Sequence, residues 1–146
     1  MRAAAPAMAK IPINEHGPHN SEVIPQMMSE IVEANLANAQ HQTDASIAHL
    51  QRAVSLEDTL DYGEPPNWLA PTRESLGAAL LAAGKAADAE KVFREDLARN
   101  ARNPRSLFGL AETLQAEGKT AEAASVRRQF QRGWKTADTK LTLSGL

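Results

Sequence analysis

Two stretches of the sequence decide the fold: LGAALLAAGKAADAEKVFR at residues 76–94 and LAETLQAEGKTAEAASVRR at residues 110–128. Shifted by 34 residues, the first stretch matches the second at nine of 19 positions. Alanine raises such a count, but the two Gly-Lys pairs and the leucine spacing do not depend on alanine. A fixed period of this length is typical of stacked repeats, so the pattern predicts an architecture before it predicts any activity.

Apolar residues at helical spacing cover most of the chain. Proline begins two of the predicted helices, at Pro71 and Pro104, and glycine ends them, at Gly84 and Gly118. We therefore expect an all-α protein. We expect an extended or disordered segment at 1–22, a helical repeat domain at 23–140 and a tail at 141–146 that folds back on the last helix. The predicted units cover about 27–60, 70–103 and 104–137, with a linker at 61–69.

The composition argues against several classes of protein. The formal net charge of −2 is unlike that of a general nucleic-acid binder. The absence of cysteine rules out a disulfide framework and thiolate metal ligands. No apolar run is long enough to cross a bilayer. The start, MRAAAPAMAK, is too short and too weakly hydrophobic for a signal peptide, so we favour a cytoplasmic location.

Charge is distributed unevenly along the chain. Residues 1–90 carry 5 basic and 12 acidic side chains, a net charge of −7. Residues 91–146 carry 11 basic and 6 acidic side chains, a net charge of +5. Because the order of repeats in a stacked array is also their order in space, the two ends should differ in electrostatic potential.

Acidic residues crowd the end of the second predicted helix, at Glu57, Asp58, Asp61 and Glu64. Negative charge at a helix C-terminus meets the unfavourable end of the helix dipole. We expect Arg73 to compensate this charge locally, and a partner or ligand is the alternative. The candidate linker contacts are Glu64, Trp68 and Arg73.

The repeated unit resembles the tetratricopeptide repeat, a two-helix motif with large, small and aromatic residues at set positions. The second unit supplies Leu76, Gly77, Leu80, Gly84, Ala89 and Phe93 for these positions. The third unit supplies Leu107, Leu110, Ala111, Leu114, Gly118, Ala123 and Phe130. The resemblance implies a right-handed α-solenoid of antiparallel helix pairs, with about three repeats and an extended C-terminal helix. The small residues would let paired helices approach closely.

The first unit fits the same pattern more loosely. Ala34, Ser46, Leu50 and Ala53 take the expected positions at an offset of 43 residues, and His41 stands where the turn glycine belongs. The linker sequence YGEPPNW at residues 62–68 resembles a link near the C-terminal end of longer bacterial proteins of this family.

The resemblance implies a non-catalytic interaction module that binds a peptide or protein on the concave face of its first helices. Mapped onto this chain, that face holds Met28, Ile31, Asn35, Asn38, Glu74, Ala78, Leu81, Arg105, Phe108, Glu112 and Gln115. The alternative is a self-associating assembly domain, a homodimer that uses the opposite charges of its halves and an apolar C-terminal end around Trp134.

No pattern in the sequence supports catalysis, a metal or a cofactor. His16 and His19 lack a third ligand, and His41 and His49 lie eight residues apart across a turn, where we expect them to be exposed. We therefore expect no enzyme and no cofactor. We also expect no nucleic-acid binding, because the arginines of the C-terminal half lack interleaved aromatic residues.

Overall fold

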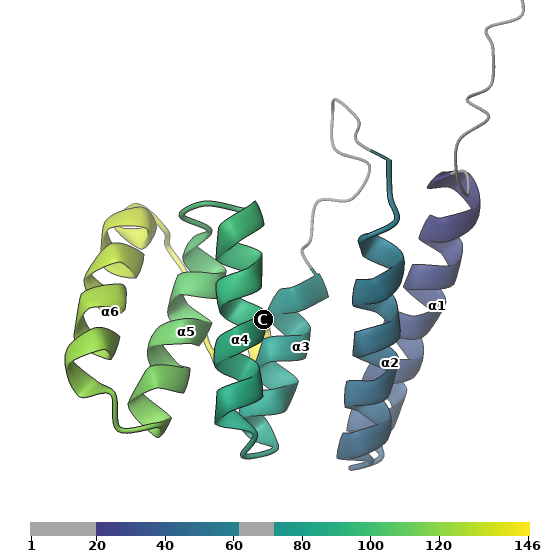
Figure 1. Ribbon diagram of the computed structural model, residues 1–146, viewed down its shortest axis with the longest axis horizontal. Helices are drawn as coiled ribbons and strands as arrows, with labels where there is room; N and C mark the ends of the chain where they lie inside the picture. Colours follow the sequence, from purple (N-terminus) through teal and green to yellow (C-terminus); the bar gives the residue numbers. More distant parts are fainter. Residues whose placement is uncertain (1–19, 62–71) are drawn as a thin grey trace, which may run out of the picture.

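The computed structural model describes residues 20–61 and 72–146, and these residues form helices and turns without strands (Figure 1). The prediction of an all-α protein is confirmed for this part of the chain. The helices are α1 (Asn20–Ala39), α2 (Thr43–Glu57), α3 (Thr72–Ala82), α4 (Ala86–Arg99), α5 (Pro104–Ala116), α6 (Thr120–Trp134) and the short 3₁₀ helix η1 (Leu143–Gly145). Helix α1 begins three residues before the predicted start of the domain. Residues 1–19 and 62–71, which include most of the predicted N-terminal segment and linker, lie outside the described residues.

The six α-helices stand side by side in chain order, from α1 at one end of the molecule to α6 at the other (Figure 1). Each helix packs against the next along the chain, and α3 also packs against α5. Within residues 20–61 and 72–146, no helix combines the length and the hydropathy needed to cross a membrane.

The 34-residue period appears in the turns. Gly84 and Gly118 have φ angles of 74° and 75°, and the next residue, Lys85 or Lys119, donates its main-chain N–H over 2.9 Å to Leu80 or Leu114. A left-handed residue followed by this bond is a helix C-cap that favours glycine.

The turn between α1 and α2 has the same form, although His41 replaces the glycine. His41 has a φ of 59°, and Gln42 donates its N–H to the Ala37 oxygen over 2.8 Å. The left-handed conformation costs an L-residue about 1–2 kcal/mol. We expect His41→Gly to be about 1 kcal/mol more stable than His41→Ala, because alanine keeps the steric cost and glycine removes it. Urea unfolding of the two variants measures the difference, and equal midpoints would contradict the expectation.

The repeated lysine of each Gly-Lys pair reaches back to the preceding unit. Lys85 binds Asp44 of α2 at 2.9 Å, and Lys119 binds Glu90 of α4 at 2.6 Å. Hydrogen bonds from Lys119 and Arg94 lower the pKa of Glu90 from its ordinary 4.5 to about 2. The lysine at this position therefore has two roles: its main-chain N–H closes the turn, and its side chain joins neighbouring units.

The low pKa of Glu90 predicts a specific acid dependence of stability. A carboxylate with a lowered folded-state pKa stabilises the fold above pH 4.5, and this contribution is lost as the pH falls towards 2. Thermal unfolding of the unaltered chain and Glu90→Gln should therefore differ most near neutral pH and converge near pH 2. An undiminished difference in Tm at pH 2 would contradict this assignment.

One aromatic side chain forms the centre of the core. Phe93 of α4 is fully buried, and it lies between Gly77 of α3 and Gly109 of α5. A Cβ atom at Gly77 would lie 2.6 Å from the ring Cζ, and one at Gly109 would lie closer still. The expected small positions Ala89, Ala111 and Ala123 are also buried, at 0%, 1% and 1% exposure. Small residues therefore allow the close packing that the pattern predicts. Gly109 is a further small residue at a close helix contact, and the repeat pattern did not identify it.

Candidate functional site

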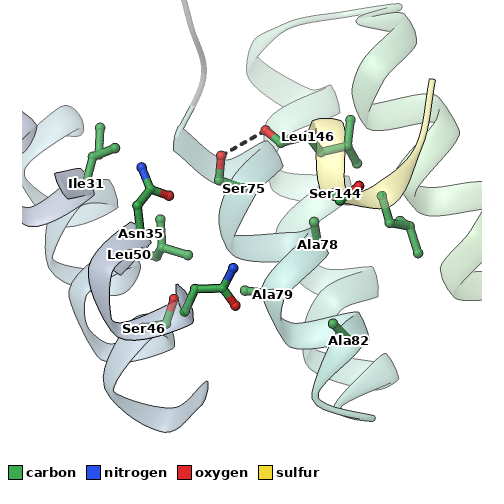
Figure 2. Close-up of a pocket in the computed structure, with 12 residues that line it drawn as sticks. Ile31, Asn35, Ser46, Leu50, Ser75, Ala78, Ala79, Ala82, Ser144 and Leu146 are labelled. Carbon is green, nitrogen blue, oxygen red and sulfur yellow. Dashed lines mark hydrogen bonds between the residues drawn. The ribbon is translucent and has the colours of Figure 1, made fainter. Parts of the chain in front are cut away.

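A groove of about 470 Å³ lies between α1 and α3 (Figure 2). Its walls combine small, amide and aliphatic side chains from three helices with the last residues of the chain. The lining residues are Ile31, Asn35, Asn38, Ser46, Leu50, Ser75, Ala78, Ala79, Ala82, Leu143, Ser144 and Leu146.

Helical spacing explains how these side chains reach one surface. On α3, the lining residues are Ser75, Ala78, Ala79 and Ala82, at positions i, i+3, i+4 and i+7 of one helix face. All four are small, so this wall has no long side chain to close the space between α1 and α3. The groove therefore exists because α3 presents only small side chains to it.

Residues 143–146 lie along this groove. In Figure 2, Leu146 and Ser144 stand beside α3, and the Ser75 hydroxyl donates a hydrogen bond of 2.9 Å to the main-chain oxygen of Leu146. Arg105 donates from Nη2 to the main-chain oxygens of Gly145 and Leu146, at 2.7 and 3.3 Å. The Leu146 side chain packs against the hydrophobic core.

The path of the tail differs from the predicted one. The Trp134 indole N–H donates to the Thr139 oxygen over 2.9 Å, so the chain first turns beside the end of α6. It then continues to α3 and α5, where Ser75 and Arg105 hold its last residues. The expectation that the tail folds back on the last helix is therefore wrong for residues 143–146, because hydrogen-bond donors and a place for Leu146 are found on α3 and α5.

A buried polar network holds Arg105 in position. The Glu74 carboxylate is almost fully buried and accepts hydrogen bonds from Arg105 Nε and, over 2.7 Å, from Asn103 Nδ2. Asn103 also donates to Asp96 over 2.9 Å, and its own side-chain oxygen accepts from the Arg105 N–H. Arg105 therefore presents its Nη2 atom to the tail from a fixed position.

The structure distributes the predicted concave-face residues among three environments. Ile31, Asn35, Asn38 and Ala78 line the groove. Arg105 binds the tail, and Glu74 supports Arg105 from a buried position. The remaining five lie elsewhere on the described surface: Met28 is 49% exposed on α1, Leu81 packs on the core, Phe108 packs at a tilted angle against Phe130 with ring centroids 5.4 Å apart, Glu112 pairs with Arg127 at 2.7 Å, and Gln115 is exposed.

Several groove residues were not identified from the sequence. Ser75, Ala79 and Ala82 could have been found, because they lie three or four residues from Ala78. The contribution of Ser46 and Leu50 depends on how α2 packs against α3, and that of the tail depends on its path across α5. The local residue pattern therefore predicts neither the contribution of α2 nor that of the tail.

The predicted compensation of the acidic helix end by Arg73 is confirmed. Arg73 binds Asp58 at 2.6 Å, and Arg99 binds the other oxygen of the same carboxylate at 2.7 Å. Arg73 is 5% exposed, and its bond to Asp58 raises its pKa. Burial raises the pKa of Glu57, which accepts the Thr72 N–H. This cluster joins α2, α3 and α4, whereas the other two linker contacts, Glu64 and Trp68, lie outside the described residues.

The described ranges contain no group of three or more histidine or acidic side chains placed to hold a metal ion. His41 is exposed as expected, but His49 is half-buried and lies 2.7 Å from Glu30 through its Nδ1 atom. The expectation that His49 is exposed is wrong, because α1 covers this face of α2. His16 and His19 lie outside the described residues.

Comparison of the sequence with protein-family models and with curated proteins gives no match.

Proposed function

We propose that this chain is a non-catalytic interaction module that binds a peptide or protein segment in the groove between α1 and α3. In this proposal, the chain is a right-handed α-solenoid of antiparallel helix pairs of the tetratricopeptide type. The common turn geometry at His41, Gly84 and Gly118 supports this architecture, as does the backward contact of each repeated lysine.

A single observation carries the function. The groove surface already holds a short segment of polypeptide, through hydrogen bonds from Ser75 and Arg105 to main-chain oxygens and through one half-buried leucine that packs against the core. Main-chain hydrogen bonds with pockets for selected side chains are a general way to bind extended peptides. Asn35 and Asn38 are exposed on the opposite wall, where their amides can pair with further main-chain groups.

A charge-neutral test uses two exposed alanines. Ala82 lines the groove and Ala98 lies on the surface of α4, away from the groove. Short random peptides displayed on phage are selected on the full chain, and their affinities for Ala82→Arg and Ala98→Arg are then compared. We expect Ala82→Arg to weaken the selected peptides about tenfold or more, since an arginine would fill the groove, and Ala98→Arg to leave them unchanged.

Selected peptides that bind both variants equally would show that the groove is not the binding surface. Both substitutions place the same side chain on an exposed helical alanine, so a difference between them does not arise from charge or helix propensity.

Self-association is the second candidate, and an exposed stripe on α1 favours it. Met28, Val32 and Leu36 are 49%, 62% and 51% exposed and follow each other at four-residue intervals. Among residues 20–61 and 72–146, such a stripe is an apolar surface without a partner. Light scattering at low and high salt tests this reading: a salt-resistant dimer that Val32→Lys dissociates would support it, and a monomer at both salts would exclude it.

A further inference from the structure

Resting on the function proposed above, we propose that the groove recognises a peptide turn with leucines at positions i and i+3, and that residues 143–146 are a built-in competitor for it. The partner is thus a protein segment with the chemistry of the sequence Leu-Ser-Gly-Leu. Its leucines insert beside α3, and Ser75 and Arg105 bind the main-chain oxygens at the end of the turn.

The shape of the tail sets the leucine spacing. Residues 143–145 form a 3₁₀ helix, in which side chains three residues apart lie above one another. Leu143 and Leu146 therefore share one side of the turn, and both line the groove. Thr142 and Gly145 are exposed and do not line the groove, whereas Ser144 is exposed and also lines it, so the turn presents its two leucines and one serine to the groove.

The hydrogen bonds are made to main-chain oxygens of the turn, so they do not depend on the identity of its side chains. The last carbonyl groups of a helical turn have no partner within the turn. Here the oxygens of Gly145 and Leu146 accept hydrogen bonds from Ser75 Oγ and Arg105 Nη2. Because Glu74 and Asn103 hold Arg105 in place, the donors are in position before a peptide arrives.

The tail is attached weakly enough to be replaced. Leu141, Leu143 and Leu146 are only half-buried, and three hydrogen bonds join residues 143–146 to α3 and α5 in the described structure. Space of about 470 Å³ remains beside the tail. A tethered occupant lowers the apparent affinity of a free peptide by the fraction of time that it fills the site.

The test uses the full chain and a labelled peptide with the sequence TKLTLSGL of residues 139–146. Fluorescence anisotropy gives its affinity for the unaltered chain and for Leu143→Ala/Leu146→Ala, whose thermal unfolding is measured alongside. We expect the doubly substituted chain to bind the peptide at least about tenfold more tightly, because the competitor is lost. Adding Ser75→Ala or Ala82→Arg to this chain should reverse the gain. A peptide with alanine at both leucine positions should not bind.

Equal peptide affinity of the unaltered and doubly substituted chains would overturn the proposal, as would equal binding of the alanine peptide. The unaltered chain could also form a dimer that the double substitution dissociates. This result would place the tail in the groove of a second copy, and it would overturn the proposal that residues 143–146 compete within their own chain. These outcomes differ from failure of the proposed function. Phage-selected peptides that lose affinity for Ala82→Arg could still lack leucines at positions i and i+3. The proposed function would then stand, and only the proposed leucine specificity would fail.

Discussion

Replacing Phe93 with alanine is expected to lower the free energy of unfolding by about 3–5 kcal/mol. Phe93 has no exposed surface and is among the largest fully buried side chains of the described residues. The space left by its ring cannot close easily, because Gly77 and Gly109 bring helix backbones, and not side chains, against it. A small domain is stable by only about 5–15 kcal/mol, so this variant should unfold at a much lower urea concentration.

Two further variants show whether the loss arises at this contact. Gly109→Ala should itself destabilise by about 1–3 kcal/mol through overpacking, although alanine is normally favoured over glycine within a helix. Gly133→Ala is the matched control, because a Cβ there would make an ordinary 3.5 Å contact with Pro104. Combining Gly109→Ala with Phe93→Leu should cost less than the sum of the single changes. Strict additivity would contradict the proposed contact.

Replacing Asp96 with asparagine is expected to cost about 2–4 kcal/mol. The Asp96 side chain is 1% exposed and accepts hydrogen bonds from Asn100, Asn103 and Ser106 at 2.8, 2.9 and 2.5 Å. An asparagine has the same shape, but its NH₂ group would face a donor and leave a buried polar group without a partner. Urea unfolding measures the loss.

Asp88 provides the matched control for this substitution. It lies on the same helix but is exposed, and Asp88→Asn should change stability by less than about 0.5 kcal/mol. Similar stability of the two variants would show that the network around Asp96 is dispensable. The network matters for the groove as well, because Asn103 connects Asp96 with Glu74, and Glu74 holds Arg105.

Local residue patterns determine the helices of this protein. The apolar spacing, Pro104 at the start of α5, and Gly84 and Gly118 in the turns predict elements that the structure contains within a few residues. These signals act through neighbouring residues, because main-chain conformation and helix faces depend on spacings of one to four positions. The correspondence of His41 with the turn glycines follows from the same local register.

Four of the twelve groove residues could be predicted on the same basis. Ile31, Asn35, Asn38 and Ala78 lie on regular faces of α1 and α3, so the repeat pattern places them on one surface. The pattern could not show that Glu74 would be buried beneath Arg105 or that Phe108 would pack against Phe130, since both depend on partners 22 or more residues away.

Only the tertiary structure decides which segment of the chain lies along the groove. The tail carries too few residues to have a conformation of its own, because isolated short helices are unstable. Its place depends on donors from α3 and α5, some 70 and 40 residues away along the chain, and on a core surface that receives Leu146. The sequence by itself thus determined the helices and the faces they present, whereas contacts between distant residues decided which face is occupied and by which part of the chain.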